Sequence, residues 1–478
     1  MITKRIRTSA LVAILLLGIC GVVSAAGKDA PRGRPNIIFV LFDDMGWAQP
    51  QSYKADSALR TPNLDRLAQQ GMRFTDAHSA AAVCTPTRYG VLTGRYPSRI
   101  GQFGVLTTFS KPIIPESRMT VASLLKQNGY TTASIGKWHL GMNWVDGKPG
   151  NEKEVPIGAK ITDGPNAIGF DYFYGFTHAR NIGTIIEQNR VVANVNAVEN
   201  QPLMIKKAVE WIGQRRKDEP FFLYFPMCPP HEPLVPSPDY IGKSGAQDLV
   251  KKSAQYGDWL FQGDAMLGQL LEALDRHQLA DNTLVIATSD NGAEQRTYEP
   301  LRESKRSIYE GGHRVPYVVR WPAKVKAGSV NDHTICLNDL LATAAEIVGA
   351  KLPANAGEDS VSLLGEFLGT AQTPAHEATV HQSSSGDLAI RQGPWKLVFL
   401  KSGRRELYNI DADLSEKKVV HAANHEVVAK LTTLMQGIID RGRSAAGEAQ
   451  KNDFALALPD GSGKAKRKKK ADCDEVDR

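Results

Sequence analysis

Apolar and polar residues are arranged along the chain in a pattern that predicts strands separated by helices. The runs "NIIFVLF" (36–42), "FFLYF" (221–225) and "TLVIATS" (283–289) are short and uninterrupted, as in strands buried on both faces of a parallel sheet. Amphipathic segments with helical spacing occur between and before these runs, at 61–70, 118–128, 203–216 and 258–277. This alternation predicts an α/β fold with a large, mostly parallel sheet flanked by helices. Ligands of such sheets gather at the carboxyl ends of the strands.

The pattern changes after about residue 350. The segments "LAIRQGPWKLVFL" and "RRELYNIDAD" predict a strand pair, and an apolar-periodic helix follows at 425–440. We therefore predict a large domain over residues 34–350 and a smaller C-terminal α+β domain over 351–445 that closes over the first. Residues 446–478 are polar and are expected to form a disordered basic tail.

The N-terminus has the plan of a secretory signal peptide. Basic residues are followed by the apolar run "ALVAILLLGICGVV" and the small residues "SAA". We expect residues 1–26 to be removed and the protein to be exported, either to the periplasm or out of the cell. No later apolar run approaches the roughly 20 residues that a membrane helix needs, so no stable membrane span is expected.

The net charge of +7 lies mostly at the two ends of the chain. The N-terminal segment and residues 464–478 each contribute +3, which leaves about +1 for the body. A broad basic face for nucleic acid is therefore not expected. We interpret "KAKRKKK" as a solvated tail, with binding of polyanions or a membrane surface as the less favoured alternative.

The five cysteines do not form a disulfide framework. Cys20 lies in the N-terminal segment, where a bulky isoleucine precedes it and disfavours attachment of a lipid, and Cys473 lies in the tail. Cys228 and Cys336 are expected to be small buried hydrophobic residues. Cys84 is the cysteine whose surroundings indicate chemistry.

Acidic and amide side chains follow two of the predicted strands. Asp43 and Asp44 end the first apolar run, and Asp290 and Asn291 follow "TLVIATS". Such hard oxygen donors suit calcium or magnesium. Either pair alone is also compatible with a loop cap or a turn. Together, on neighbouring strands, they predict a metal site.

The stretch "AAAVCTPTRYGVLTGR" (80–95) predicts a helix that starts beside Cys84. Pro86 suits the first helical position and Thr85 its cap, so that Cys84 falls just outside the helix. A helix N-terminus favours anions and can activate a nucleophile. Arg88, four residues on, offers a forked donor to an oxyanion. This pattern suits a tetrahedral anion, although a buried thiol near a surface arginine would show the same residues.

Basic and titratable side chains also occur near predicted strand ends. "ASIGKWHLG" carries Lys137 and His139 two residues apart, and in an extended chain both point to one face. The prolines of "PMCPPHEP" would hold His231 in a fixed loop, and Lys305 lies in the polar segment "LRESKRSIYEGGHRVP". A lysine beside an imidazole suits charge stabilisation and proton transfer. Each segment alone is equally compatible with an ordinary strand or surface loop.

Taken in order, these motifs are highly specific. They are Asp43-Asp44, "CTPTR" with "LTGR", "GKWHLG", "PPHEP", Asp290-Asn291-Gly292 and "SKRSIYEGGHRVP". The set resembles the formylglycine-dependent type I sulfatases of the alkaline phosphatase superfamily, over residues 35 to about 325. "GPWKLVFL" and "ELYNIDAD" also resemble the small C-terminal domain of that family.

The resemblance implies a role for Cys84. In the family, the cysteine of the Cys-x-Pro-x-Arg motif is oxidised by a maturation enzyme to formylglycine, an aldehyde that hydrates to a geminal diol. One hydroxyl attacks sulfur, and the other then expels sulfate and regenerates the aldehyde. The protein is thus expected to be a sulfuric ester hydrolase that acts on an aryl sulfate or a sulfated carbohydrate.

The resemblance also implies roles for the other motif residues. One calcium ion would be held by Asp43, Asp44, Asp290 and Asn291 together with residue 84. Arg88 and Lys137 would steady the formylglycine and the metal, and His139 would accept a proton during sulfate release. His231 and Lys305 would bind the sulfate and assist the leaving oxygen.

The chain departs from the family pattern around Lys305. Many relatives have glycines there, as in Gly-Gly-Lys-Gly, whereas this chain has "ESKRS", and His313 falls where an aliphatic residue is frequent. Glu303, Arg306 and His313 are therefore candidates for shaping substrate choice, with a surface role as the alternative. The segment 143–200 is expected to form much of the pocket rim, where four side chains suit either a sugar or loop packing: Trp144, Tyr172, Tyr174 and His178.

Two other functions fit parts of the sequence. A phosphomonoesterase or phosphodiesterase on the same fold would favour serine or threonine at position 84 and more acidic residues for a second metal. A catalytically dead binding protein for sulfated glycans would use the basic tail, but the complete set of motif residues argues against a dead site.

Overall fold

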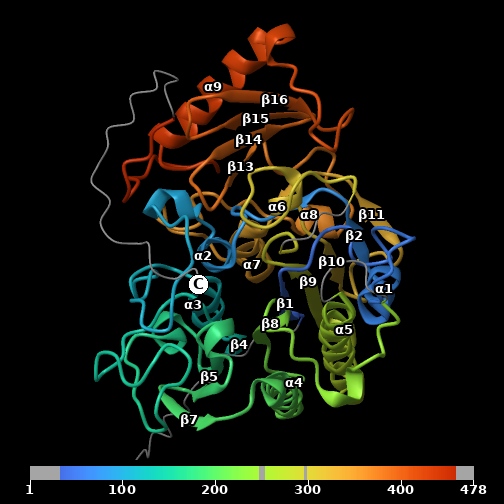
Figure 1. The fold of residues 1–478 in the computed structure, drawn as a ribbon, viewed down its shortest axis with the longest axis vertical. Coiled ribbons are helices and arrows are strands. Elements are labelled where there is room, and N and C mark those ends of the chain that lie inside the picture. Colours follow the sequence, from blue (N-terminus) through green and yellow to red (C-terminus); the bar gives the residue numbers. More distant parts are fainter. Residues whose placement is uncertain (1–32, 247–252, 295–298, 459–478) are drawn as a thin grey trace, which may run out of the picture.

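The computed structural model describes residues 33–246, 253–294 and 299–458. The predicted signal peptide, Cys20, Cys473 and the "KAKRKKK" segment lie outside the described residues. A sheet of ten strands crosses the molecule in the order β11-β2-β10-β9-β1-β8-β4-β5-β6-β7 (Figure 1). Its strands are β1 (Asn36–Asp43), β2 (Met72–Phe74), β4 (Thr131–Lys137), β5 (Tyr172–Phe176), β6 (Thr184–Glu187), β7 (Arg190–Asn194), β8 (Phe221–Pro230), β9 (Thr283–Ser289), β10 (Tyr317–Arg320) and β11 (Ser329–Asn331).

The centre of this sheet is parallel, and antiparallel pairs lie toward its edges. β9, β1, β8, β4 and β5 are paired in parallel. β10 pairs antiparallel with β9, and β6 pairs antiparallel with both β5 and β7. This confirms the predicted mostly parallel sheet. All eight residues of β1 are buried, because both of its faces are covered.

Helices cover the two faces of the sheet. Ile38, Val40 and Phe42 of β1 share a core with α1 (Pro62–Gln70), α4 (Ala197–Gly213) and α5 (Ser253–Arg276). Ile37, Phe39 and Leu41 share the opposite core with α2 (Cys84–Thr93), α3 (Val121–Gln127) and α7 (Leu340–Val348). Successive side chains of a strand point to opposite faces, so the uninterrupted apolar run supplies both cores. No helix among the described residues has the length and apolar character needed to cross a membrane.

A second, antiparallel sheet lies at the C-terminal end of the chain (Figure 1). It contains β13 (Thr379–Gln382), β14 (Leu388–Gln392), β15 (Trp395–Phe399) and β16 (Arg405–Asn409), and α9 (His425–Asp440) packs on it. The sequence predicted two strands here, but "LAIRQGPWKLVFL" folds back on itself. Gly393, with φ +53°, and the following proline form the turn that pairs Gln392 with Trp395. The remaining short elements are β3 (Ala77–His78), β12 (Ile335–Cys336), α6 (Glu310–His313) and α8 (Leu364–Phe367).

The beginning of the predicted disordered tail is ordered, which corrects that part of the prediction. Asp453 forms an ion pair of 2.7 Å with the buried Arg95, and the Phe454 ring packs edge-on against Phe103 at 6.2 Å between centroids. Residues 446–458 are therefore held against the large domain by an ion pair and by aromatic packing. The polar composition of this segment does not reveal these partners. The tail beyond residue 458 lies outside the described residues.

Candidate active site

Four neighbouring strands of the large sheet end at one edge, and each delivers a polar side chain there. Phe42 of β1 is in register with Ser289 of β9, so Asp43 and Asp44 lie beside Asp290 and Asn291. This confirms that the two acidic motifs are neighbours. His231 follows β8, and Lys137 is the last residue of β4.

The oxygen atoms at this edge form a set that fits a bound cation. Asn291 donates from Nδ2 to Asp44 Oδ1 at 2.7 Å, and the Asp44 amide donates to Asp290 Oδ1 at 3.1 Å. Asp43 Oδ1 and Asn291 Oδ1 are buried and accept no hydrogen bond from the described residues. Buried oxygens without donors are costly, and carboxylate and amide oxygens are the ligands that calcium prefers.

The pKa values of the carboxyl groups also indicate that positive charge is missing from this site. Burial and the nearby Asp43 charge raise the pKa of Asp290 to about 7. Burial alone would also raise the pKa of Asp43, but the charges of Lys137 and Arg88 hold it well below its usual value. The local cations thus favour the carboxylate of Asp43 but leave Asp290 short of positive charge.

Each of the three carboxylates contacts a buried cation. Arg88 Nη2 contacts Asp290 Oδ2 at 2.8 Å, and Lys305 Nζ contacts Asp44 Oδ2 at 2.7 Å. Lys137 Nζ donates to Asp43 Oδ2. Buried charges require such partners. Arg88, Lys137 and Lys305, which lie far apart in the sequence, are thus brought together at the acidic motifs.

Cys84 is the first residue of α2, so the helix begins two residues earlier than expected. Val83 occupies the cap position with extended φ and ψ of −149° and 158°. Thr85 is not the cap, because its hydroxyl donates instead to the His139 carbonyl at 2.9 Å. The Cys84 sulfur lies within 4.8 Å of carboxylate oxygens of Asp43 and Asp290.

The thiol itself is not an activated nucleophile. Cys84 is 1% exposed, and burial raises the pKa of its thiol above the usual value, although Lys137 and Lys305 act in the opposite direction. Since the thiolate is the reactive form of cysteine, the unmodified side chain is poorly suited to attack. The helix N-terminus does not activate it as the sequence had suggested.

His139 is placed by a turn, so the argument from strand alternation was wrong. β4 ends at Lys137, and His139 has a left-handed φ of +58°. Its Nε2 donates to the Leu106 carbonyl at 2.9 Å, which leaves Nδ1 buried and without a hydrogen-bond partner among the described residues. Burial and the Lys137 charge hold the His139 pKa well below its usual value. The ring is therefore neutral, with a free lone pair that can accept a proton.

His231 and Lys305 approach the acidic cluster from the same side. His231 Nε2 lies 3.7 Å from Asp44 Oδ2, the oxygen that Lys305 also contacts. The other ring nitrogen of His231 donates to the Glu232 carbonyl. Burial and the Lys305 charge lower the pKa of His231 to about 3. The two side chains together offer a fixed positive charge and a neutral imidazole.

The aromatic side chains expected at the pocket rim pack elsewhere. Trp144 is buried, donates from Nε1 to the Thr108 carbonyl at 2.9 Å and packs edge-on against Phe109. Tyr172 contacts Glu187, and Tyr174 lies under Lys207. These three residues are thus engaged in loop and strand packing. His178 lies closer to the site, because its ring stacks on His139 at 5.4 Å between centroids.

Comparison with known proteins identifies the family. The Sulfatase family model matches residues 35–350. The chain belongs to the sulfatase family. Its relatives include an N-acetylgalactosamine-6-O-sulfatase of Bacteroides thetaiotaomicron, 32% identical over 495 residues, which cover 85% of this chain and 94% of the relative. Human arylsulfatase A is 32% identical over 417 residues, covering 79% and 77% of the two chains.

Solved structures show the same fold. One, described with the metabolism of multiple glycosaminoglycans by Bacteroides thetaiotaomicron, superimposes with a TM-score of 0.76 at 30% sequence identity. The match covers 85% of this sulfatase and 99% of that chain. The predicted fold class and the predicted activity class, a sulfuric ester hydrolase, are both confirmed.

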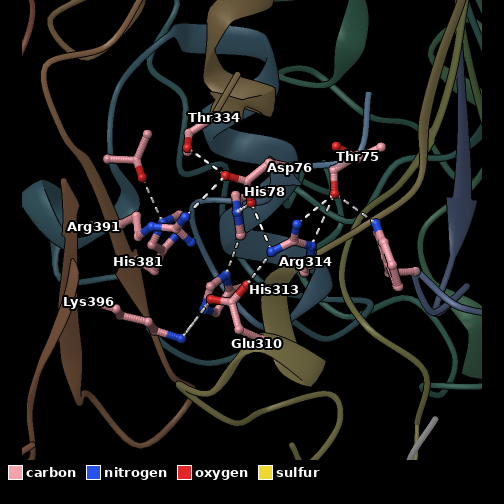
Figure 2. Close-up of polar contacts among 12 residues, drawn as sticks. Thr75, Asp76, His78, Glu310, His313, Arg314, Thr334, His381, Arg391 and Lys396 are labelled. Atoms are coloured by element: carbon pink, nitrogen blue, oxygen red, sulfur yellow. Dashed lines mark hydrogen bonds and ion pairs between the residues drawn. The ribbon is translucent and has the colours of Figure 1, made fainter. Parts of the chain in front are cut away.

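The sulfatase contains a second group of metal-ligand side chains, away from the strand ends (Figure 2). His78, His313 and His381 are fully buried. His78 and His313 face each other through their Nδ1 atoms at 3.0 Å. The His313 and His381 rings stack at 4.2 Å between centroids with an interplanar angle of 8°. Two parallel stacked rings cannot both direct an in-plane lone pair at one ion, so this arrangement disfavours a metal.

The surrounding contacts indicate a structural junction instead. His78 Nε2 contacts Asp76 Oδ1 at 2.8 Å, and His381 Nδ1 donates to the Ser79 carbonyl at 3.0 Å. Lys396 of β15 lies 3.0 Å from His313 Nε2 (Figure 2). The cluster thus ties β3 and α6 of the large domain to the C-terminal sheet. His313 is buried in this junction, which corrects the expectation that it shapes substrate choice.

Replacing His313 with leucine is expected to lower the free energy of unfolding by about 1–3 kcal/mol, because His78 Nδ1 would lose its buried partner. Urea unfolding followed by circular dichroism would measure the change. His421→Leu, at an exposed position, serves as the control and should have little effect. Equal stability of the two variants would contradict a junction held by these hydrogen bonds.

Proposed function

We propose that this sulfatase hydrolyses a sulfate monoester on a sulfated carbohydrate through a formylglycine made from Cys84. The observation that carries the proposal is a buried Cys84 at a helix start, beside Asp43 and Asp290 but with a pKa unsuited to thiolate chemistry. Conversion to an aldehyde explains why a cysteine of low reactivity stands there. The names of the bacterial relatives, which refer to N-acetylgalactosamine and glycosaminoglycans, support a sugar. Arylsulfatase A supports turnover of aryl sulfates in assays.

Two groups would complete the site. A calcium ion held by Asp43, Asp44, Asp290 and Asn291, together with residue 84, would neutralise charge on the sulfate oxygens. The hydrated formylglycine would supply the attacking hydroxyl. The oxygens of Asp43 and Asn291 that accept no hydrogen bond from the described residues fit such a cation.

The remaining residues act on these groups and on the sulfate ester. Arg88 and Lys137 hold Asp290 and Asp43 in position through the contacts described above. His139 accepts a proton at its free Nδ1 during sulfate release. Lys305 and His231, which share Asp44 as a neighbour, bind the sulfate and assist the leaving oxygen.

We further propose export of the protein, because residues 1–26 have the plan of a signal peptide. A formylglycine-generating enzyme would then act on the chain as a transient partner, since Cys84 is buried once the chain has folded. Cys84 would therefore be modified before the large domain folds around it.

Peptide mass spectrometry across residues 74–88 tests the nucleophile. In a host that matures a control sulfatase, residue 84 is expected to be an aldehyde, and 4-nitrophenyl sulfate should be hydrolysed in clear preference to 4-nitrophenyl phosphate. Preference for the phosphate without sulfatase activity would favour a phosphatase. A plain cysteine beside a converted control, with retention of sulfated glycans but no turnover, would favour a binding protein.

A further inference from the structure

The loop that carries Lys305 adopts a backbone conformation that glycine normally supplies. Glu303 and Arg306, on either side of Lys305, have left-handed φ values of +58° and +78°. This region costs a non-glycine residue of order 1 kcal/mol, and such strain gathers at functional sites. Glycine adopts it freely. The side chains of Glu303 and Arg306 are therefore present at an energetic cost, which suggests that they have a function.

The strained loop is fixed from two directions. The Arg306 amide donates to the Ala82 carbonyl at 2.7 Å, two residues before Cys84. The Arg306 carbonyl accepts from the Ser384 amide at 3.1 Å. The Glu303 carboxylate accepts a hydrogen bond from the Ser307 hydroxyl. The loop is thus held between the nucleophile segment and the C-terminal sheet, in a geometry that fixes where Arg306 points.

Both strained residues line a cleft beside Lys305. The cleft has a volume of about 310 Å³, and its lining includes Glu303, Lys305 and Arg306. Ser384, Ser385 and Asp387, from the β13–β14 connection, also line it. This volume is at the lower end of the range for small-molecule sites. Hydroxyl and carboxylate side chains in such a wall suit the hydroxyl groups of a sugar better than a flat apolar ring.

Arg306 places a second positive charge next to the proposed sulfate site. Glu294 bridges the two cations, at 3.4 Å from Lys305 Nζ and 2.6 Å from Arg306 Nη2. The Arg306 side chain is nevertheless 54% exposed. One carboxylate therefore separates a buried lysine that faces the acidic cluster from an accessible guanidinium. A forked guanidinium recognises carboxylate and sulfate groups particularly well.

We propose that Arg306 is a specificity residue that pairs with a second anionic group of the substrate. The substrate class is then an acidic sulfated oligosaccharide, whose sugar occupies this cleft while a carboxylate or further sulfate meets Arg306. This proposal rests on the proposed function, because it takes Lys305 as the residue that binds the reacting sulfate. According to this proposal, the enzyme recognises the charge of the neighbouring sugar in addition to the sulfate ester.

The test compares Arg306→Gly with the wild-type enzyme on three substrates. These are a sulfated disaccharide with a uronic acid carboxylate, its neutral sulfated counterpart, and 4-nitrophenyl sulfate. Wild type is expected to prefer the acidic disaccharide. The variant should lose about 10- to 100-fold in kcat/KM on that substrate and far less on 4-nitrophenyl sulfate. KM for the acidic disaccharide should rise with salt in wild type and less so in the variant.

Gln278→Gly is the matched control. It also replaces a residue with a left-handed φ, of +55°, by glycine, but Gln278 lies outside the cleft. It should leave all three substrates unaffected. A preference of wild type for the neutral sugar or the aryl sulfate, or an equal loss of Arg306→Gly on every substrate, would overturn the proposal while leaving the sulfatase activity intact. Absence of turnover of all three by enzyme with an aldehyde at residue 84 would instead contradict the proposed function.

Discussion

Replacing Cys84 with alanine is expected to reduce sulfate-ester hydrolysis by more than about a thousandfold, the scale seen when a nucleophile is removed. Alanine keeps Cβ but cannot become an aldehyde, so the attacking oxygen is lost. The acidic cluster and its three cations stay in place, because their ion pairs and hydrogen bonds do not involve the Cys84 sulfur. The measurement is kcat/KM on 4-nitrophenyl sulfate with purified protein.

The variant should remain folded. Only one small, buried atom is removed at Cys84, so the free energy of unfolding should fall by about 1 kcal/mol. Cys336→Ala is the matched control, since that thiol is also 1% exposed but lies in the core under the C-terminal sheet. It should show a similar loss of stability with full activity. Retained turnover by Cys84→Ala would rule out residue 84 as the nucleophile.

The acidic cluster could be predicted from the sequence because it depends on the sheet alone. Uninterrupted apolar runs identify strands buried on both faces, and parallel strands bring their carboxyl ends to one edge. Asp43 and Asp290 therefore had to be close once β1 and β9 were neighbours. His231, which follows β8, and Lys137, which ends β4, lie at the same edge because these are the next two strands of the sheet.

Features that depend on distant partners were missed. α4 begins at Ala197, before the predicted start at 203, and continues through Pro202. Pro202 has no amide hydrogen to donate to the Val198 carbonyl. That carbonyl instead accepts a hydrogen bond from the Ser237 hydroxyl at 3.4 Å. The sequence around the helix does not show this partner. In the same way, the packing of Trp144 and the burial of His313 are decided by residues far along the chain.

The strained loop around Lys305 could be predicted only in part from the sequence. The absence of glycines in "ESKRS" pointed to Glu303 and Arg306 from the sequence, but only the backbone shows that both occupy left-handed conformations. His313 was singled out by the same departure from the family pattern, yet it belongs to the buried junction. Sequence differences near a site therefore identify candidates, and burial separates those that can meet a substrate.

Replacing Asp290 with asparagine is expected to abolish the stabilisation of the enzyme by calcium, and to reduce hydrolysis at least about a hundredfold. Asparagine keeps an oxygen for the Asp44 amide but removes the charge that pairs with Arg88 and would face the ion. In wild type, removing calcium with a chelator should lower Tm. Saturation at a hundred times Kd stabilises a folded protein by about 2.7 kcal/mol. Adding calcium should restore Tm in wild type but not in Asp290→Asn.

Asp359→Asn separates the loss of the ion from the loss of a buried ion pair. Asp359 is also fully buried and contacts Arg99 Nε at 2.7 Å, outside the acidic cluster. Breaking either pair should cost up to about 3 kcal/mol, because each leaves an arginine without its buried partner. Asp359→Asn should nevertheless keep the rise in Tm with calcium and the sulfatase activity, since its oxygens do not belong to the site. If calcium raised Tm equally in wild type and Asp290→Asn, or in neither, then Asp290 would not be a calcium ligand. The Asp43 and Asn291 oxygens that accept no hydrogen bond would then need another partner.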